Sequence, residues 1–404
     1  MKKWMALALI VVMAFAACQA AWAEEIQLPE ITGFTQFDIP DNEAMEFLKK
    51  MGVGWNLGNT FDAFVDGAPW YRGTELDLET AWVGVKTSEE LITAVHEMGF
   101  STIRIPVSWH EHVSKEDFAI SEAWLGRVQE VVDYAYNQGM YVILNTHHDV
   151  YPEFYYPSEQ YAAQSEKYIK SIWTQLAERF QDYDEHLIFE SMNEPRLKET
   201  SYEWYFNATE PQCVESAECI NKLNQVFVDT VRASGGQNET RYLMVPGYDA
   251  SPENAVNDFF TLPEDTADNR IIVSAHAYTP YTFALQIGGT PTFTLGSNNQ
   301  TGEINRFITS LYNTYISQGI PVVIGEFGAL DQKGNLQDRV NFAAFYTTAA
   351  SARNIPCCWW DNHAFSGNGE LFGLIDRKTC EWRYPEIAQA ITQNAGYDNI
   401  PAKE

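Results

Sequence analysis

Short apolar segments alternate with longer amphipathic segments after residue 40, and they do so eight times. The apolar segments are rich in β-branched residues and have the length of buried strands. They lie at 52–59, 101–107, 140–148, 187–194, 241–247, 271–278, 321–328 and 355–362. The amphipathic segments predict helices at 87–99, 121–139, 162–180, 218–235, 301–319, 336–354 and 384–396, with a weaker one near 252–260. Eight strand–helix pairs predict an α/β fold, a single (β/α)8 TIM barrel with extended βα loops.

The alternative for such a pattern is a doubly wound parallel sheet. That fold would place a glycine-rich phosphate turn after an early strand. The nearest candidate, Gly52-Val53-Gly54, lies at the start of its strand, so the barrel is preferred. The long segments 60–86, 195–217 and 279–300 follow predicted strands, on the barrel face where active sites are built, and 279–300 is the best lid candidate.

The chain divides into four segments. Residues 1–23 have the pattern of a signal peptide, with two lysines before an apolar run at 6–16 and a small-x-small cleavage site at 21–23. We therefore expect a secreted protein. Lipid attachment at Cys18 is the weaker alternative, because Phe15 stands where a smaller aliphatic residue is usual. Behind this segment come a lead-in at 24–40, the catalytic domain at 41–397 and a tail at 398–404. No later segment is apolar enough to predict a transmembrane span.

Composition restricts the partners. The chain of 404 residues has 55 acidic and 26 basic residues and a formal charge of −29, which disfavours nucleic acids and anionic membranes. Hydrophobic residues make up 45%, which excludes a disordered chain. Aromatic residues reach 14%, which suits either sugar-binding surfaces or an aromatic core. We expect a monomer.

Five cysteines follow the signal segment. Cys213 and Cys219 flank a short acidic stretch and could form a local disulfide in an oxidising compartment. Cys380 could pair with Cys357 or Cys358, which would leave one thiol free. None of these cysteines has the spacing of a metal site, and no CxxC motif occurs.

Two glutamates terminate apolar runs. Glu194 follows Asn193 at the end of the fourth predicted strand, and Glu326 ends the apolar part of the seventh. A lone glutamate there is more often a helix cap or a loop ion pair, but these two face each other across the barrel mouth. Such a pair suits glycoside hydrolysis, in which one carboxyl group donates a proton while the other, ionised, attacks or activates water. A separation of roughly 5–5.5 Å would make the second a nucleophile.

Seven sequence blocks carry a family resemblance. They read GWNLGNT at 54–60, TIRIPVSW at 102–109, LNTHHD at 144–149, NEPR at 193–196, HAY at 276–278, GEFG at 325–328 and WWDN at 359–362. In this order they resemble glycoside hydrolase family 5, a family of retaining β-glycanases on the (β/α)8 barrel. Within it, the chain is most similar to the bacterial endoglucanase and xyloglucanase subfamily. The resemblance spans about residues 40–396.

The resemblance implies that Glu194 is the acid/base and Glu326 the nucleophile. Arg104, at the end of the second strand, can hydrogen-bond Glu326 and keep it ionised, because a nearby cation favours the charged form of a carboxylate. A structural ion pair beneath the barrel mouth is the alternative for this arginine. Asn193, beside the acid, can contact a sugar 2-hydroxyl.

Two further residues from the sixth strand are expected at the site. Tyr278 can donate to the nucleophile, and His276 can orient the acid/base or bind a sugar hydroxyl. His147 and His148 are adjacent, and neighbours on a strand point to opposite faces, so we do not expect them to chelate one ion. The resemblance makes them sugar-contacting or carboxylate-orienting residues. We expect no metal and no cofactor.

Aromatic residues supply the remaining candidates. Trp360, closing the eighth strand, resembles the family's platform beneath the reacting sugar, whose axial C–H bonds pack on an aromatic face. Other candidate subsite residues are Asn59, Trp70, Trp82, Trp204 and Tyr205, and local loop packing is the alternative for the aromatic ones. Trp109 could lie in the groove or wedge the second loop.

Together these features predict a secreted, retaining endo-β-1,4-glucanase. Its partner would be a neutral β-glucan polysaccharide: a cellulose derivative, mixed-linkage glucan or xyloglucan. A β-mannanase, a xylanase or a licheninase on the same barrel is the alternative within enzymes, because the fold does not fix the substrate. A glycan-binding protein without catalysis is the alternative outside them, and the presence of both glutamates and Arg104 argues against it.

Overall fold

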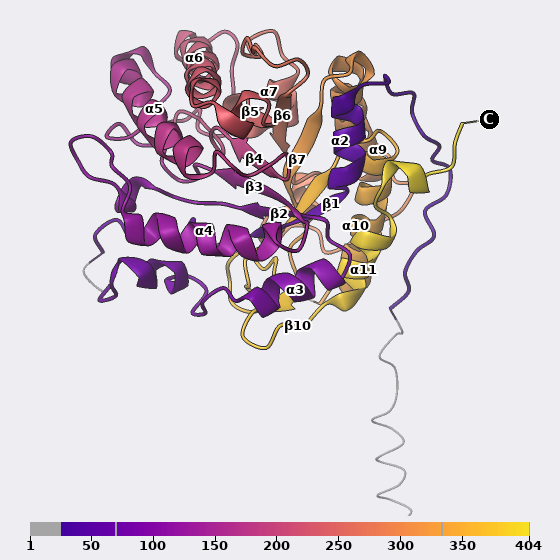
Figure 1. The fold of residues 1–404 in the computed structure, drawn as a ribbon. Helices are drawn as coiled ribbons and strands as arrows, with labels where there is room; N and C mark the ends of the chain where they lie inside the picture. Colours follow the sequence, from indigo (N-terminus) through magenta and orange to yellow (C-terminus); the bar gives the residue numbers. More distant parts are fainter. Residues whose placement is uncertain (1–25, 69–70, 333, 404) are drawn as a thin grey trace, which may run out of the picture.

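The computed structural model describes residues 26–68, 71–332 and 334–403. Eight parallel strands close into a barrel in sequence order, with the helices packed outside it (Figure 1). The strands are β1 (Val53–Leu57), β2 (Thr102–Ile105), β3 (Tyr141–Asn145), β4 (Leu187–Glu190), β5 (Leu243–Pro246), β6 (Ile271–His276), β7 (Val322–Phe327) and β8 (Cys357–Asp361). The predicted (β/α)8 barrel is confirmed. The predicted signal peptide, Cys18 and Trp70 lie outside the described residues.

The outer helices follow the predicted order. They are α3 (Glu89–Glu97), α4 (Glu122–Tyr136), α5 (Ala162–Arg179), α6 (Pro211–Ala233), α7 (Pro252–Ala255), α9 (Thr301–Thr314), α10 (Leu336–Ser351) and α11 (Pro385–Gln393). Helix α6 begins seven residues earlier than predicted, with Pro211 in its first turn, where a missing N–H costs nothing. The loop predicted at 195–217 is correspondingly shorter. The sequence reading missed a two-stranded hairpin, β9 (Ile375–Asp376) and β10 (Glu381–Trp382), and the short α8 (Tyr281–Ala284).

Another missed helix, α2 (Glu43–Met51), closes the amino-terminal end of the barrel. Asn42 caps it by accepting a hydrogen bond from the backbone N–H of Met45. Phe47 on its buried face stacks on Tyr242 at a centroid distance of 3.7 Å and meets the edge of Tyr141 at 5.3 Å. Both tyrosines lie at the amino-terminal ends of their strands, opposite the end where the candidate site residues lie.

The strands end earlier than predicted at their carboxyl ends. β4 pairs with β5 only through Phe189–Leu243 and Glu190–Met244, so the ladder stops at Glu190. β3 likewise ends at Asn145, whose side chain accepts the backbone N–H of Val107. Residues 146–148 and 191–194 therefore belong to the loops at the barrel mouth.

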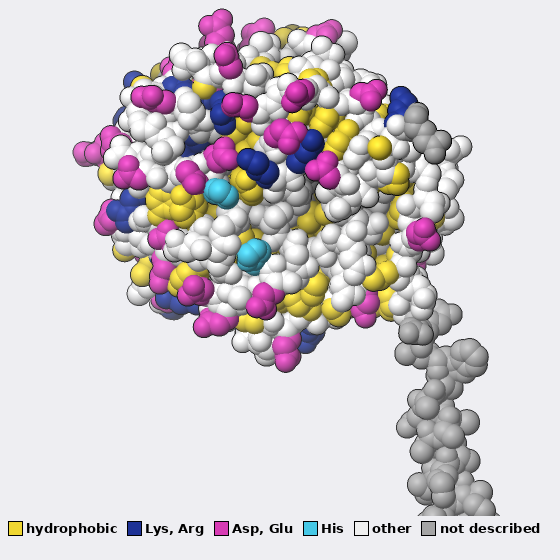
Figure 2. All heavy atoms as spheres, turned by 45° about the vertical axis from the view of Figure 1, so that its right-hand side comes forward, with side chains coloured by type: hydrophobic (Ala, Val, Ile, Leu, Met, Phe, Trp, Pro, Cys, Tyr) yellow, Lys and Arg dark blue, Asp and Glu magenta, His cyan; other side chains and the backbone are white. Residues whose placement is uncertain are grey.

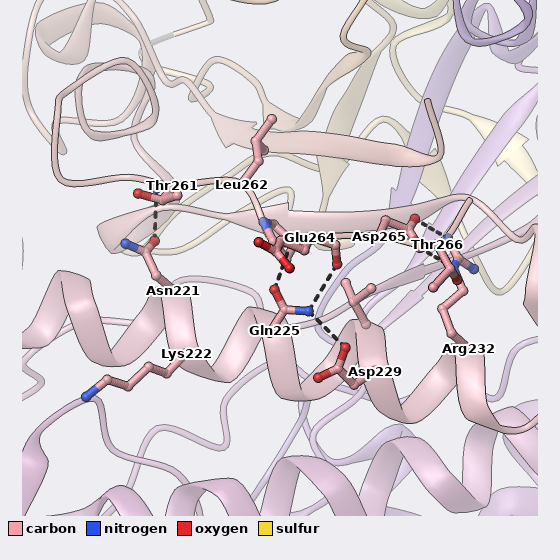
Figure 3. A pocket seen from close by; sticks show the side chains of 12 residues that line it. Asn221, Lys222, Gln225, Asp229, Arg232, Thr261, Leu262, Glu264, Asp265 and Thr266 are labelled. Carbon is pink, nitrogen blue, oxygen red and sulfur yellow. Dashed lines mark hydrogen bonds and ion pairs between the residues drawn. The ribbon is translucent and has the colours of Figure 1, made fainter. Parts of the chain in front are cut away.

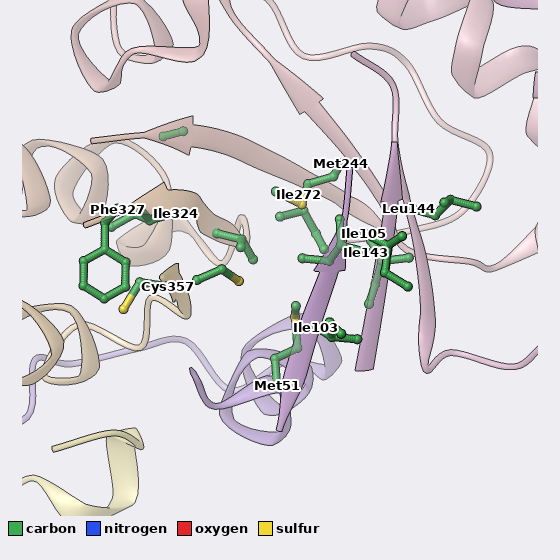
Figure 4. Packing of buried hydrophobic residues seen from close by; sticks show 14 of the residues in the cluster. Met51, Ile103, Ile105, Ile143, Leu144, Met244, Ile272, Ile324, Phe327 and Cys357 are labelled. Atoms are coloured by element: carbon green, nitrogen blue, oxygen red, sulfur yellow. The ribbon is translucent and has the colours of Figure 1, made fainter. Parts of the chain in front are cut away.

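The apolar core surrounds the barrel and continues into its lower part. Strands of a parallel barrel are buried on both faces, which explains their nearly uninterrupted apolar sequences. Figure 4 shows side chains from α2 and several strands in one cluster, including Met51, Ile103, Ile105, Ile143, Leu144, Met244, Ile272, Ile324, Phe327 and Cys357. In the described part of the chain, no helix combines the length and the hydropathy needed to cross a bilayer.

Neither of the disulfides that the sequence left open is present. All five described cysteines are free thiols. Cys213 and Cys219 lie on α6, where six residues separate their Cα atoms by about 9 Å along the axis, beyond the reach of a disulfide. Cys357 and Cys358 are neighbours on β8 and point to opposite faces, while Cys380 lies in the turn between β9 and β10. The acidic stretch between Cys213 and Cys219 is helical, not a loop.

The first prediction concerns α2. Phe47→Ala removes a buried ring between two tyrosines and should lower the free energy of unfolding by about 3–5 kcal/mol, as measured by urea denaturation. Turnover per folded molecule should not change, because α2 lies at the opposite end of the barrel from the site. Leu28→Ala, at a position 40% exposed, is the matched control and should change stability little. A loss below about 1 kcal/mol for Phe47→Ala would contradict the role of α2 as a packed closure.

Candidate active site

Arg104 occupies the centre of the barrel mouth. Its guanidinium is fully buried and donates to Glu326 (Nη1–Oε1, 2.7 Å), to Glu190 (Nε–Oε2, 2.8 Å) and to Asn193 (Nη2–Oδ1, 2.6 Å). Asn56 Oδ1 accepts a further bond from Nη1 at 3.0 Å. Burial alone would lower the pKa of Arg104, but the charges of Glu190 and Glu326 raise it above its usual value. The expected contact between Arg104 and Glu326 is therefore present.

Glu326, on β7, is almost fully buried and receives two donors. Arg104 binds Oε1, and the hydroxyl of Tyr278 donates to Oε2 at 2.9 Å. Burial first, and then the charge of Glu326, raises the pKa of Tyr278 well above its usual value, so the phenol keeps its proton. Both carboxylate oxygens of Glu326 therefore accept a hydrogen bond.

Glu194, in the loop after β4, has different partners. His276 Nδ1 lies 2.8 Å from Glu194 Oε1, and the backbone carbonyl of Glu194 accepts from Arg196 Nη1 at 2.8 Å. Burial alone would lower the pKa of His276, but the charge of Glu326 and the hydrogen bond with Glu194 raise it. A single proton therefore lies in the hydrogen bond between His276 Nδ1 and Glu194 Oε1.

The two glutamates lie close together at the barrel mouth. One oxygen of Glu194, one oxygen of Glu326 and a ring nitrogen of His276 all lie within 4.8 Å of one another. So close an approach is compatible with the short class of carboxyl pairs, in which the second carboxylate can act as a nucleophile.

Glycine at position 325 allows this close approach. A Cβ atom there would lie 3.0 Å from Nε2 of His276 and 3.5 Å from Nε of Arg104. The register between β6 and β7 also shifts at Ala275/His276, so that His276 pairs with Glu326. The absent side chain and the irregular pairing together let His276 face the carboxylates.

His147 and His148 lie differently from the prediction. β3 ends at Asn145, so the strand alternation does not apply, and one ring nitrogen of each histidine lies within 4.8 Å of the other and of an Asp62 oxygen. The premise that they could not approach one ion is therefore wrong. Both Asp62 oxygens already accept backbone N–H groups, from Asn59 and Thr60. Burial, followed by the charges of His148 and Arg104, holds the pKa of His147 well below its usual value.

Aromatic rings border the groove beside these histidines. The Trp360 ring lies parallel to that of His147, with centroids 5.8 Å apart, and the indole of Trp82 tilts over His148 at 6.0 Å. Trp82 is 40% exposed and donates to the carbonyl of Phe64. Asn59 has a positive φ of 60° and follows Gly58, where a Cβ would lie 2.7 Å from the Trp360 ring. Asn59, Trp82, His148 and Trp360 thus lie near one another at the barrel mouth.

The other loop aromatics separate into two kinds. Trp109 is fully buried and donates to the carbonyl of Asn145, so it wedges the second loop and does not line the groove. Trp204 and Tyr205 are 60% and 63% exposed. The guanidinium of Arg196, which donates to the backbone carbonyl of Glu194, stacks on Trp204 at 3.9 Å. Trp204 therefore lies on the Glu194 side of the barrel mouth.

Comparisons with known proteins agree with this geometry. The family model "Cellulase (glycosyl hydrolase family 5)" matches residues 66–366. The chain belongs to glycosyl hydrolase family 5. It is a glycoside hydrolase of the endoglucanase type.

Relatives cover most of the chain. A glycoside hydrolase 5 lichenase from Caldicellulosiruptor sp. F32, solved in complex with cellotetraose, is 54% identical, covers 92% of this chain and 100% of its own, and superposes with a TM-score of 0.90. Endoglucanase 1 of Ruminococcus albus is 41% identical over 89% of this chain and 83% of its own length. Endoglucanase A of Clostridium longisporum is 40% identical, and the match covers 88% of this chain and 66% of that relative.

Several residues of this family 5 site were missed by sequence reasoning. Glu190, Asn145, Ser274 and Asn56 form a polar layer beneath Glu194 and Glu326, joined by hydrogen bonds to Arg104 or to Glu190. Each lies inside an apolar strand sequence. A single polar residue at an inward-facing position of such a strand is the signal that could have identified them.

A second buried arginine supports the groove wall. Arg377 donates to the carbonyl of Gly58 at 2.9 Å and to the hydroxyl of Thr60 at 2.7 Å, and it pairs with Asp361 at 3.3 Å. It thereby ties the loop after β1 to the end of β8. Trp360 immediately precedes Asp361, so this ion pair holds the tryptophan against Gly58.

One surface hollow lies away from these residues. A hollow of about 790 Å³ separates the outer face of α6 from residues 261–266, where Asn221, Gln225 and Arg232 bond the loop (Figure 3). None of the described residues that line it belongs to the predicted site. Acidic side chains are more prominent than basic ones on the face seen in Figure 2, as the net charge requires.

The second prediction concerns the phenol beside Glu326. Tyr278→Phe removes a hydrogen bond to a charged acceptor and should lower kcat/KM about 10–100-fold. The control Tyr315→Phe removes a buried hydroxyl that donates to the carbonyl of Ala255, and it should leave hydrolysis unchanged. Steady-state kinetics on a soluble β-glucan make the comparison. Equal rates for wild type and Tyr278→Phe would show that the phenol does not support Glu326.

Proposed function

We propose that Glu326 is the nucleophile and Glu194 the acid/base of a retaining endo-β-1,4-glucanase. The observation that carries this proposal is the close pair of carboxyl groups with unlike partners. Glu326 lies between a guanidinium and a phenol, which favour the carboxylate, whereas Glu194 shares a proton with His276. Unlike environments are how a site assigns acid and nucleophile roles to two similar groups.

The reaction then proceeds in two displacements. An oxygen of Glu326 bonds to the anomeric carbon while the glycosidic bond breaks, and the leaving oxygen takes the proton from Glu194. Glu194, now ionised, removes a proton from water, whose oxygen replaces Glu326 on the same carbon. Asn193 accepts from Arg104 through Oδ1, so its amide N–H groups remain to donate to the sugar 2-hydroxyl.

The groove supports a neutral β-glucan as the substrate. Trp360 offers a face to a pyranose ring, and Asn59, Trp82, His147 and His148 supply polar and aromatic contacts in this proposal. Trp70 stays a candidate from the sequence alone. The structural relatives include a lichenase, a broad specificity endoglucanase and a xyloglucan-specific endo-β-1,4-glucanase. We therefore propose mixed-linkage β-glucan, soluble cellulose derivatives and xyloglucan as substrates. Licheninase action is the second candidate, because the lichenase is 54% identical.

Secretion is part of the same proposal. A polymeric glucan does not enter a cell, and the pattern at 1–23 is that of an export signal. The acidic surface suits a neutral polymer and would repel polyanionic glycans such as pectin. We propose that the enzyme acts as an exported monomer.

The third prediction tests the two glutamates. Glu194→Gln and Glu326→Gln each keep the shape of the side chain and remove its acid–base function, so each should lower turnover by roughly 10³-fold or more while leaving the fold intact. Glu122→Gln, an exposed residue on α4, is the matched control. Circular dichroism verifies folding, and reducing-sugar release measures turnover. Near-wild-type activity in either site variant would refute its assignment.

The fourth prediction tests stereochemistry and substrate together. Proton NMR of the first products from barley β-glucan should show β-anomers before mutarotation, because two inversions at one carbon retain its configuration. A panel with carboxymethylcellulose, xyloglucan, glucomannan and xylan should give the highest rates on the glucans. Initial α-anomers would exclude the double displacement. If no glycan on the panel yields products, a glycan-binding role without catalysis would replace the proposal.

A further inference from the structure

Glu190 is a buried carboxylate that the two-displacement chemistry does not use. It is the last residue of β4 and is completely inaccessible to solvent. Its Oε2 accepts from Nε of Arg104 at 2.8 Å and from Asn145 at 3.0 Å, and its Oε1 accepts from the Ser274 hydroxyl at 2.7 Å. Nη2 of Arg104 also lies 2.8 Å from Oε2. Arg104, Asn145 and Ser274 thus supply donors to both carboxylate oxygens of Glu190.

Glu190 also faces the pair that holds the reactive proton. Its Oε1 lies 4.0 Å from Nε2 of His276, while Nδ1 of the same ring contacts Glu194. Nε2 is buried and has no hydrogen-bond partner among the described residues. An imidazolium at this position would therefore direct one N–H toward Glu194 and the other toward Glu190.

The charges at the barrel mouth explain why this placement matters. Three carboxylates, Glu190, Glu194 and Glu326, lie beside two guanidinium groups: Arg104 contacts Glu190 and Glu326, and Arg196 lies 4.0 Å from Glu194. With all three carboxylates ionised, the group would carry a net charge of −1 in a medium that screens poorly. A proton on the Glu194–His276 pair neutralises that charge. Without the charge of Glu190, the electrostatic stabilisation of this proton on the pair is weaker.

We propose that Glu190 is a positioning residue for the hydrolysis, which fixes Arg104 against Glu326 and keeps the reactive proton on the Glu194–His276 pair. This inference rests on the proposed function of Glu194 and Glu326. Glu190 touches no substrate, because it lies beneath Arg104 and is sealed from solvent. It acts through the arginine and through its electric field at His276.

Other titratable groups also face this region. Besides Arg104 and Glu326, they are His147, His148 and Tyr155 after β3, Arg196 after β4, Asp249 after β5, Tyr278 after β6, Cys358 on β8 and Glu370 in the loop that follows. All of these side chains remain in the protein when Glu190 alone is replaced. A shift of the pH profile in a Glu190 variant is therefore attributable to the charge at that position.

The fifth prediction is a change in the pH dependence of kcat/KM. Glu190→Gln keeps an oxygen that can accept from Arg104 and removes one negative charge about 4 Å from His276. The alkaline limb should move to lower pH by about 1 unit, since the proton on the Glu194–His276 pair is held less tightly. That shift corresponds to about a tenfold loss on the alkaline side. The acid limb should move in the same direction, because Arg104 then favours ionised Glu326 more strongly.

A second variant, whose expected pH shift has the opposite sign, tests the same inference and keeps the charge of Glu190. Ser274→Ala deletes the hydroxyl that donates to Oε1, the oxygen that faces His276. The hydroxyl dipole no longer offsets part of the negative charge of Glu190, so this charge acts more strongly on His276. The alkaline limb should therefore move to higher pH, by about 0.3 unit. This variant keeps the inference falsifiable if Glu190→Gln does not fold.

Glu79→Gln is the matched control. Glu79 is equally buried and pairs with Arg127 at 2.8 Å, but its other partner is the backbone of Thr87 and it contacts no site residue. This substitution should lower the melting temperature and leave both limbs in place. Limbs that stay at their wild-type positions in Glu190→Gln and in Ser274→Ala would overturn the inference. If Glu326→Gln retained full activity, the proposed function would fail instead, so the two failures are distinguishable.

Discussion

The buried guanidinium of Arg104 is the interaction on which the site depends. A cation inside the barrel is tolerated only with partners for its charge and its N–H groups, and removal of one partner from such a buried pair costs several kcal/mol. Those partners come from β4 (Glu190), β7 (Glu326), β1 (Asn56) and the loop after β4 (Asn193). Arg104 therefore ties together strands that are not neighbours in the barrel. The distance between Glu194 and Glu326 follows from this arrangement.

A second buried arginine, Arg377, stabilises the proposed sugar-binding wall, as Arg104 stabilises the proposed catalytic groups. Arg377 joins the loop after β1 to the end of β8 through Gly58, Thr60 and Asp361. The aspartate also accepts the indole N–H of Trp55 and the backbone N–H of Leu374. The Trp360 face is thus held by groups that never meet substrate. A platform for a sugar ring must be rigid. If its loop became ordered only on binding, the entropy cost would lower the affinity, and stacking would not restore it.

The sequence predicted the barrel because strand length and apolar composition repeat regularly, and it predicted Arg104, Glu194 and Glu326 because polar residues end apolar runs. It failed where tertiary contacts decide the outcome. Glu190 lies inside the strand segment predicted at 187–194, so a search for polar residues at the ends of apolar runs did not find it. The His147–His148 geometry depends on where the β3 ladder stops, at Asn145. The cysteines were misread because the segment between Cys213 and Cys219 is helical, which its acidic composition does not reveal.

Chemistry and substrate choice are carried by different layers of this enzyme. Glu190, Arg104, Asn145 and Ser274 belong to strands and are buried, so their positions follow from the barrel itself. Trp82, Trp204 and Tyr205 belong to loops and are exposed. Relatives whose names refer to lichenase and to xyloglucan superpose on this barrel with TM-scores of 0.90 and 0.77. Enzymes with different glucan substrates therefore share this scaffold. Loop substitutions can alter which glucan binds while the charge arrangement beneath stays fixed, because the exposed aromatic residues and the buried charged residues belong to different elements.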